Sequence, residues 1–211
     1  MKLPRQYTRS DKSDPIGWCA LIALGFLALC WHRLGLPSKP YFDETHYVPA
    51  ARSLLQLVPA NREHPLLGKE FIAAFIALFG DKAAAWRMPA SLAGAFGLFA
   101  FGRLIWWSSQ RRFAAIAGMA LLATNFSWFV QSRIAMLDIF AASLALVALW
   151  QFAAALRQPV RHARWRLALC GVSLGLALGA KWTALPIAVL PGLSFALLKL
   201  LAPANSLRSA K

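Results

Sequence analysis

Long apolar runs are the feature that most constrains how this chain can fold. Six of them reach or approach the length of a membrane-spanning helix: residues 16–34, 88–107, 113–131, 139–156, 167–180 and 182–201. Crossing the hydrocarbon core of a bilayer takes about 20 apolar residues, so the fifth run needs residues from its flanks. Only 15% of the residues are charged, whereas a soluble domain has about a quarter. The sequence therefore predicts an all-α integral membrane protein with about six transmembrane helices.

A seventh apolar stretch, residues 71–79, is too short to cross. A helix of this length rises about 14 Å, and the hydrocarbon core is about 30 Å thick. If this stretch does not cross, the amino terminus, 103–112, 157–166 and the tail from Lys199 share one side with 14 of the 23 Lys and Arg residues. The opposite side then has six of the eight acids. Because basic loops favour the cytoplasm, we predict a cytoplasmic amino terminus and an outer-face interfacial helix over 64–80.

These assignments divide the chain into three parts. They are a cytoplasmic segment at 1–15, a membrane domain at 16–201 with an outer loop at 35–87, and a cytoplasmic tail at 202–211. The outer loop also contains a second expected interfacial helix, with Pro49 in its first turn and one apolar face. That face consists of Val48, Ala51, Leu54, Leu55 and Val58.

The basic character of the chain, with a net charge of +15, would suggest a nucleic-acid partner in a soluble protein. Here the basic residues lie in short segments between apolar runs, so we predict membrane lipid as the surroundings and no nucleic acid. The three cysteines, Cys19, Cys30 and Cys170, lie within apolar runs and lack the spacing of metal ligands. We therefore expect no metal site and no cofactor.

Three outer segments contain most of the polar residues that are costly near a bilayer. They are Asp43-Glu44 with His46, the stretch from His64 to Lys69, and the stretch from Arg133 to Asp138, which Lys181 joins from the last outer turn. Two adjacent acids offer a general base and an orienting carboxylate. Nearby cations can hold a phosphate and stabilise its charge as it leaves.

Each of these residues also has a purely structural interpretation. Paired acids in a loop are usually solvated, and Lys181 can be a turn residue whose side chain snorkels to the interface. Arg133 and Asp138 can form an ion pair that caps two helices. His64 can be a simple turn residue, and Arg87 can anchor a span at the headgroups.

Four segments, in their order and spacing, resemble the motifs of the protein O-mannosyltransferase family, whose members are lipid-carrier-dependent glycosyltransferases with the GT-C fold. They are Phe42-Asp43-Glu44-Thr45-His46-Tyr47, His64-Pro65-Leu66-Leu67-Gly68-Lys69, Trp86-Arg87-Met88 and Ser132-Arg133-Ile134-Ala135-Met136-Leu137-Asp138. One departure is Leu66, where the family pattern has a second proline. A larger departure is length: the family has more spans, so the chain is similar to its amino-terminal part only.

The resemblance implies a hexosyltransferase that moves a sugar, expected to be mannose, from a polyprenyl- or dolichyl-phosphate carrier to an acceptor. The acceptor would be a Ser or Thr hydroxyl of a protein, or a glycolipid, at the periplasmic, extracytoplasmic or lumenal face. The implied catalytic residues are Asp43, Glu44 and Asp138, with Asp43 as general base, and the implied substrate-binding residues are His64, Lys69, Arg133 and Lys181. No nucleotide and no metal is implied.

Two other functions stay open beside a fragment or split half of such an enzyme. In one, the chain is a catalytically inactive scaffold or assembly partner of a glycosyltransferase, and a second polypeptide supplies the missing half. In the other, it transports a lipid or a small solute. A transporter should have ionisable residues at mid-span. Here the polar groups gather at one face, which favours chemistry at the membrane surface.

Overall fold

A computed structural model describes residues 13–59, 61 and 63–201. Its elements are α1 (Ile16–Trp31), α2 (Glu44–Leu55), α3 (Leu67–Phe79), α4 (Ala83–Ser109), α5 (Arg112–Ala123), α6 (Phe126–Gln131), α7 (Asp138–Ala155), α8 (Val160–Ala180), the short 3-10 helix η2 (Trp182–Ala184) and α9 (Leu185–Leu201). Every element of these described residues is helical, which confirms the all-α prediction. The predicted cytoplasmic residues 1–12 and 202–211 lie outside the described part.

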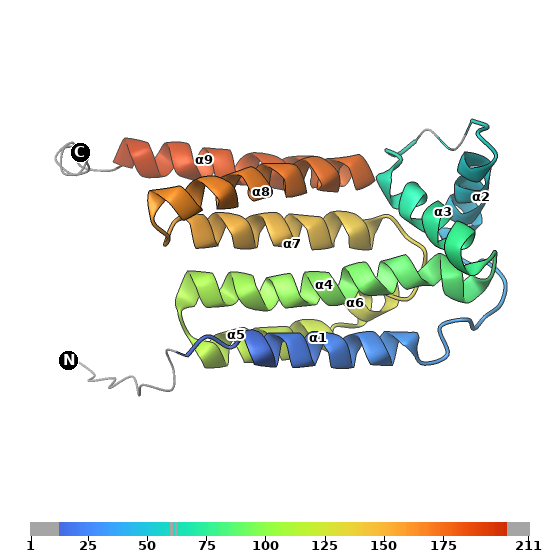
Figure 1. Cartoon of the computed structure of the whole chain (residues 1–211), viewed down its shortest axis with the longest axis horizontal. Coiled ribbons are helices and arrows are strands. Elements are labelled where there is room, and N and C mark those ends of the chain that lie inside the picture. The colour runs from blue at the N-terminus through green and yellow to red at the C-terminus, as the bar shows by residue number, and fades with distance from the viewer. Residues whose placement is uncertain (1–12, 60, 62, 202–211) are drawn as a thin grey trace.

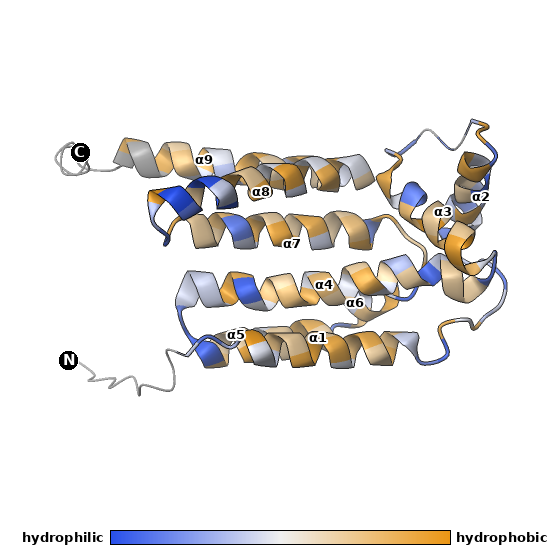
Figure 2. Cartoon of the chain, in the orientation of Figure 1, coloured by the Kyte–Doolittle hydropathy of each residue, from blue (hydrophilic) through white to orange (hydrophobic). Residues whose placement is uncertain are grey.

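The long helices lie along one axis, and the two helices predicted to be interfacial lie at one end of it (Figure 1). Figure 1 shows α1, α4, α5, α7, α8 and α9 along the long axis, with α2 and α3 together at one end. We call this the α2–α3 end; the opposite end, where α1 begins and α9 ends, is the terminal end. Figure 2 shows apolar residues along the long helices and a hydrophilic group at the start of α8, at the terminal end.

Two helices, α4 and α7, are long and apolar enough to cross a membrane, judged by length and composition. Helices α1 and α5 and the segment Trp182–Leu197 are apolar but shorter. The fifth apolar run does extend into its flank, because α8 begins at Val160. The fold is therefore helical with two membrane-capable helices and several shorter apolar ones, and the number of crossings remains a prediction.

The apolar run 113–131 forms two helices instead of one. Helix α5 ends at Ala123, and the side chain of Asn125 accepts a hydrogen bond from the backbone N–H of Trp128 at 2.9 Å. This is the N-cap contact that starts a new helix. The break separates α6 from α5, and the length of the apolar run alone did not predict it.

Helix α2 also differs from its prediction. It begins at Glu44, so Pro49 lies inside the helix and not in its first turn. Of the expected apolar face, Val48 is fully buried whereas Leu55 and Val58 are 45% and 46% exposed. The reason is that α2 packs by its first two turns, so the face predicted toward its carboxyl end has little to cover it.

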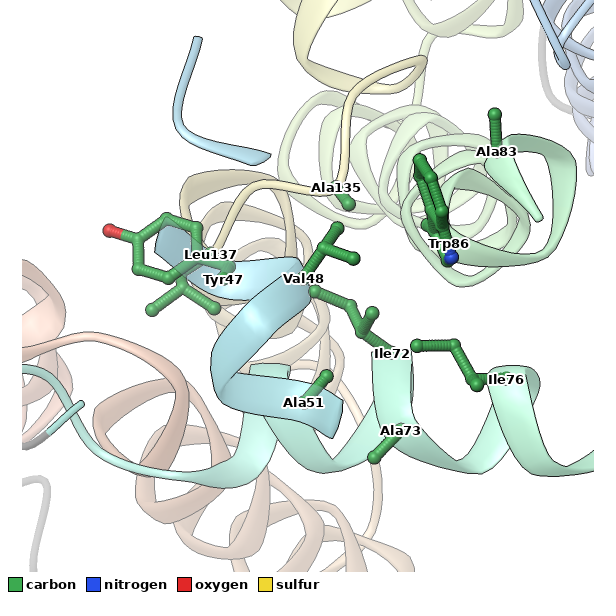
Figure 3. Close-up of a cluster of buried hydrophobic side chains, with 10 residues drawn as sticks. All are labelled: Tyr47, Val48, Ala51, Ile72, Ala73, Ile76, Ala83, Trp86, Ala135 and Leu137. Carbon is green, nitrogen blue, oxygen red and sulfur yellow. The ribbon is translucent and has the colours of Figure 1, made fainter. Parts of the chain in front are cut away.

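The core at the α2–α3 end holds these two helices against the start of α4. Figure 3 shows its side chains from α2, α3, α4 and the segment before α7, with Val48 facing Ile72 and Trp86 nearby. Elsewhere α1, α4 and α5 share one apolar cluster, and α4, α7 and α8 share another. At the α4–α7 contact a Cβ on Gly97 would lie 2.4 Å from Ser143 Oγ, so this close approach requires glycine. The core at the α2–α3 end therefore fixes the start of α2 relative to α4 and to the segment before α7.

Candidate active site

Glu44 and Arg87 form a buried ion pair below the surface of the α2–α3 end. Glu44 Oε1 accepts from Arg87 Nε at 2.7 Å, and Oε2 accepts from Arg87 Nη2 at 2.8 Å. The two side chains are 0% and 1% exposed. Glu44 Oε1 also accepts from the backbone N–H of Ala135 at 3.0 Å, and Oε2 accepts from that of Tyr41 at 3.3 Å. The Glu44 carboxylate therefore contacts protein groups on both oxygens.

Arg87 extends the same network to the segment after α1. Its Nη1 donates to the carbonyl oxygens of Leu34 and Pro37, each at 2.9 Å. Its guanidinium also lies over the ring of Tyr41, 5.1 Å from the centroid. One arginine thus connects α4, α2 and the 34–41 segment. Arg87 is no headgroup anchor, because buried charges need partners and this side chain has a complete set.

Asp138 and Lys181 meet across the starts of α7 and η2. Lys181 Nζ donates to both oxygens of Asp138, at 2.7 Å each. The lysine side chain is 14% exposed and the aspartate 31%, so the pair lies at the surface. Two segments that are 43 residues apart in the sequence therefore come together.

Arg133 lies apart from this pair. Its guanidinium is 3.4 Å from the carbonyl oxygen of Leu29 and 3.5 Å from that of Arg33, over the ring of Phe129. The alternative of an Arg133–Asp138 ion pair is wrong, because Asp138 pairs with Lys181. Arg133 instead faces the end of α1.

Lys69 is fully buried at the start of α3. Its Nζ donates to the carbonyl oxygen of Asn61 and to that of His64, the latter at 2.8 Å. Burial lowers the pKa of Lys69, and the nearby Glu63 carboxylate opposes that shift. The ammonium group thereby holds the backbone at Asn61 and at His64. The His64 ring lies 6.4 Å from the ring of Tyr47, centroid to centroid.

Asp43 has the free carboxylate of the adjacent acid pair. Its backbone carbonyl accepts from His46 and Tyr47 N–H groups at 3.0 and 3.1 Å. Its half-buried side chain has no hydrogen bond or ion pair with any described residue. Asp43 is thus positioned by the backbone of α2, while its carboxylate stays available.

Three acids affect the pKa of Tyr47. Burial raises the pKa of its hydroxyl to about 12, and the negative charges of Asp43, Asp138 and Glu63 add to the rise. The three carboxylates therefore act on the Tyr47 hydroxyl electrostatically. Figure 3 shows the Tyr47 ring packed at the edge of the apolar cluster with its hydroxyl pointing away from it. Sequence reasoning quoted Tyr47 within a motif but gave it no role.

Similarity to known proteins covers almost the whole chain. A family model described as dolichyl-phosphate-mannose-protein mannosyltransferase matches residues 19–210. The chain belongs to this family. A polyprenol-phosphate-mannose–protein mannosyltransferase from Mycolicibacterium smegmatis is 31% identical over 205 residues, which is 80% of this chain and 39% of the relative. A namesake from Corynebacterium glutamicum is 31% identical over 82% of this chain and 40% of the relative.

An animal relative matches more distantly. Protein O-mannosyltransferase 1 of Drosophila pseudoobscura pseudoobscura is 27% identical over 70% of this chain and 18% of the relative. No solved structure matches the chain significantly. The chain spans about two-fifths of the length of the bacterial mannosyltransferases it matches.

Within this chain, the predicted site residues fall into two groups. In one group, Asp43 and Asp138 both act on the pKa of Tyr47, His64 lies beside the Tyr47 ring, Lys181 pairs with Asp138, and Lys69 donates to the His64 carbonyl. Glu44 and Arg133 face other segments. The described part contains no group of three or more His, Cys, Asp or Glu residues that could hold a metal ion.

Proposed function

We propose that this chain is the part of a mannosyltransferase that holds the acceptor and the general base. The enzyme would move mannose from a polyprenyl- or dolichyl-phosphate carrier to a Ser or Thr hydroxyl of a protein, at the outer face of the membrane. The observation that supports this best is an Asp43 carboxylate without a partner among the described residues, at the same end of the molecule as the Asp138–Lys181 pair (Figure 1), in a chain of this family. Further sequence, on the same or on a second polypeptide, would supply the rest of the membrane domain.

The chemistry follows from these groups. The acceptor hydroxyl gives its proton to Asp43 while its oxygen attacks the anomeric carbon from the face opposite the phosphate. The bond from that carbon to the phosphate oxygen breaks, and the lipid phosphate leaves with the electron pair. A lysine ammonium has three donors. Lys181 can therefore hold Asp138 and still donate to the departing anion, which needs charge stabilisation more than a proton.

Glu44, Arg87 and Lys69 would act as positioning residues. Glu44 holds Arg87 and the Ala135 backbone, which fixes Asp43 one residue earlier in the chain. Lys69 holds the carbonyls of Asn61 and His64. We propose that these buried charges set the geometry and do not contact the sugar.

A direct assay tests this function. Membranes from cells that express the full protein should transfer radiolabelled mannose from polyprenyl phosphate mannose to a Ser/Thr-containing peptide, and the product should be alkali-labile. Membranes that lack the protein serve as the control. If the protein and its genomic neighbour together give no transfer above that control, the chain is better explained as a scaffold.

Outer-face action makes a separate prediction about topology. At the terminal end, Arg103 pairs with Asp14, and Arg157 donates to the Ser108 carbonyl at 2.7 Å. The basic segments thus lie together, away from Asp43, and should be cytoplasmic. In a variant whose native cysteines are replaced, a cysteine at exposed Ser38 should react with an impermeant thiol reagent in intact cells. One at exposed Ser108 should react only after lysis; labelling of Ser108→Cys from outside would invert the topology.

A further inference from the structure

An open pocket includes in its lining Tyr41 and Phe42, the two residues that precede Asp43 in the sequence. Its volume is about 380 Å³. It is formed by the segment before α2, by α6 and by the segment before α7, and its lining includes Tyr41, Phe42, Phe126, Ser127, Gln131 and Met136. No charged residue lines it among those the structure describes. The proposed transfer step does not involve the residues of this pocket.

Phe42 is held in an unusual way at the edge of this pocket. Its φ is +53°, in the left-handed region that side chains other than glycine seldom adopt. The Phe42 carbonyl accepts from Thr45 Oγ1 at 2.7 Å, and the preceding Tyr41 N–H donates to buried Glu44. This anchoring leaves the Phe42 ring 67% exposed. Backbone strain beside an available carboxylate is typical of a functional segment.

Phe126 contributes a second exposed ring to the pocket lining. It lies in the first turn of α6 and is 80% exposed. Ser127 and Gln131 follow on the same short helix and contribute neutral hydrogen-bonding groups. The pocket therefore offers aromatic faces with a few amide and hydroxyl groups, a combination that suits an extended, uncharged polypeptide.

We propose that this pocket binds the residues that flank the acceptor Ser or Thr of the protein substrate, an inference that rests on the proposed function. An extended chain advances about 3.3–3.6 Å per residue. When the acceptor hydroxyl is at Asp43, its close neighbours in the chain reach Phe42 and then Phe126. Because no charged group lines the pocket, a charged flanking residue would lose hydration without gaining a partner. The pocket thus selects acceptor sites with uncharged flanks.

The first test compares two exposed phenylalanines. Phe126→Ala should raise the KM for an Ala/Pro-flanked Ser peptide about five- to tenfold, with kcat and the KM for polyprenyl phosphate mannose unchanged. Phe113→Ala is the matched control, because Phe113 is 79% exposed on α5 at the terminal end. It should change none of these values. If Phe126→Ala raises the carrier KM instead, or leaves the peptide KM unchanged, the pocket does not bind acceptor.

The second test asks for a change of specificity, which a structural role would not produce. Gln131→Lys should lower the KM for a peptide with Asp beside the acceptor Ser and raise it for the same peptide with Lys there. The unmodified protein should bind both worse than the neutral peptide. Equal KM values for the three peptides in both proteins would overturn the proposal.

A photocrosslinking measurement separates this inference from the proposed function. A Ser peptide with benzoylphenylalanine next to the acceptor should crosslink to residues 126–136 without any carrier, and less so in Phe126→Ala. Such a crosslink without transfer would leave the pocket standing and end the enzymatic proposal. Transfer with crosslinks only elsewhere would overturn the pocket and leave the enzyme.

Discussion

Replacing Arg87 by methionine is expected to destabilise the protein by about 3–5 kcal/mol, because the buried Glu44 carboxylate loses its partner. Methionine preserves most of the side-chain length, so the change is mainly electrostatic. The carbonyls of Leu34 and Pro37 also lose their donor. Thermal unfolding in detergent, followed by circular dichroism, should show a large fall in Tm with little folded protein recovered.

Arg52→Met is the matched control for this change. Arg52 lies at the same end of the molecule and pairs with Asp81 at 2.7 Å, but these side chains are 40% and 45% exposed. Exposed ion pairs contribute about 0–1 kcal/mol. The two variants should therefore differ severalfold in their effect on stability. Equal effects would mean that the Glu44–Arg87 network is not what holds the α2–α3 end together.

A double variant separates charge from connectivity. Glu44→Gln in the Arg87→Met background leaves no buried charge, so part of the stability should return. Full recovery is not expected, because the carbonyls that Arg87 satisfied remain without a donor. The recovered fraction measures how much of the loss comes from the isolated carboxylate.

The lengths of the apolar runs predicted the long helices but not every helix boundary. Runs 88–107 and 139–156 correspond to α4 and α7, because a continuous apolar stretch leaves the backbone few alternatives to a helix. The break at Asn125 was missed because a single capping residue decides it within an otherwise apolar run. Caps act over three residues, and hydropathy averages over far more.

The site was predictable in its segments but not in its partners. The acid pair, the His64–Lys69 stretch and the Asp138–Lys181 contact all lie at one end of the bundle (Figure 1). Which charge meets which depends on helix rotation. Adjacent residues point about 100° apart on a helix, so Glu44 turns inward while Asp43 does not. The buried partner of Glu44 had a signal: an arginine at the edge of an apolar helix needs a counter-charge.

Asp43→Asn is expected to lower kcat for mannosyl transfer about 10²–10⁴-fold, since it removes the proposed base and keeps the side-chain volume. The KM for the lipid-linked donor should change little, because the proposed role of Asp43 is to accept a proton and not to contact the phosphate. The variant should fold normally, since the Asp43 carboxylate has no partner to lose among the described residues. This separates it from Glu44→Gln, whose loss of activity would come with a loss of stability.

The matched control is Glu70→Gln. Glu70 is exposed on α3 at the same end, so the variant removes one negative charge from the same region without touching the proposed base. Its kcat should stay within about twofold, as expected of a surface charge. Asp43→Glu should keep a fraction of the activity, because it retains a carboxylate that is displaced by one methylene. If Asp43→Asn and Glu70→Gln transfer mannose at equal rates, Asp43 is not the base. The candidates for the base are then Glu63 and Asp138, the other acids whose charges act on Tyr47.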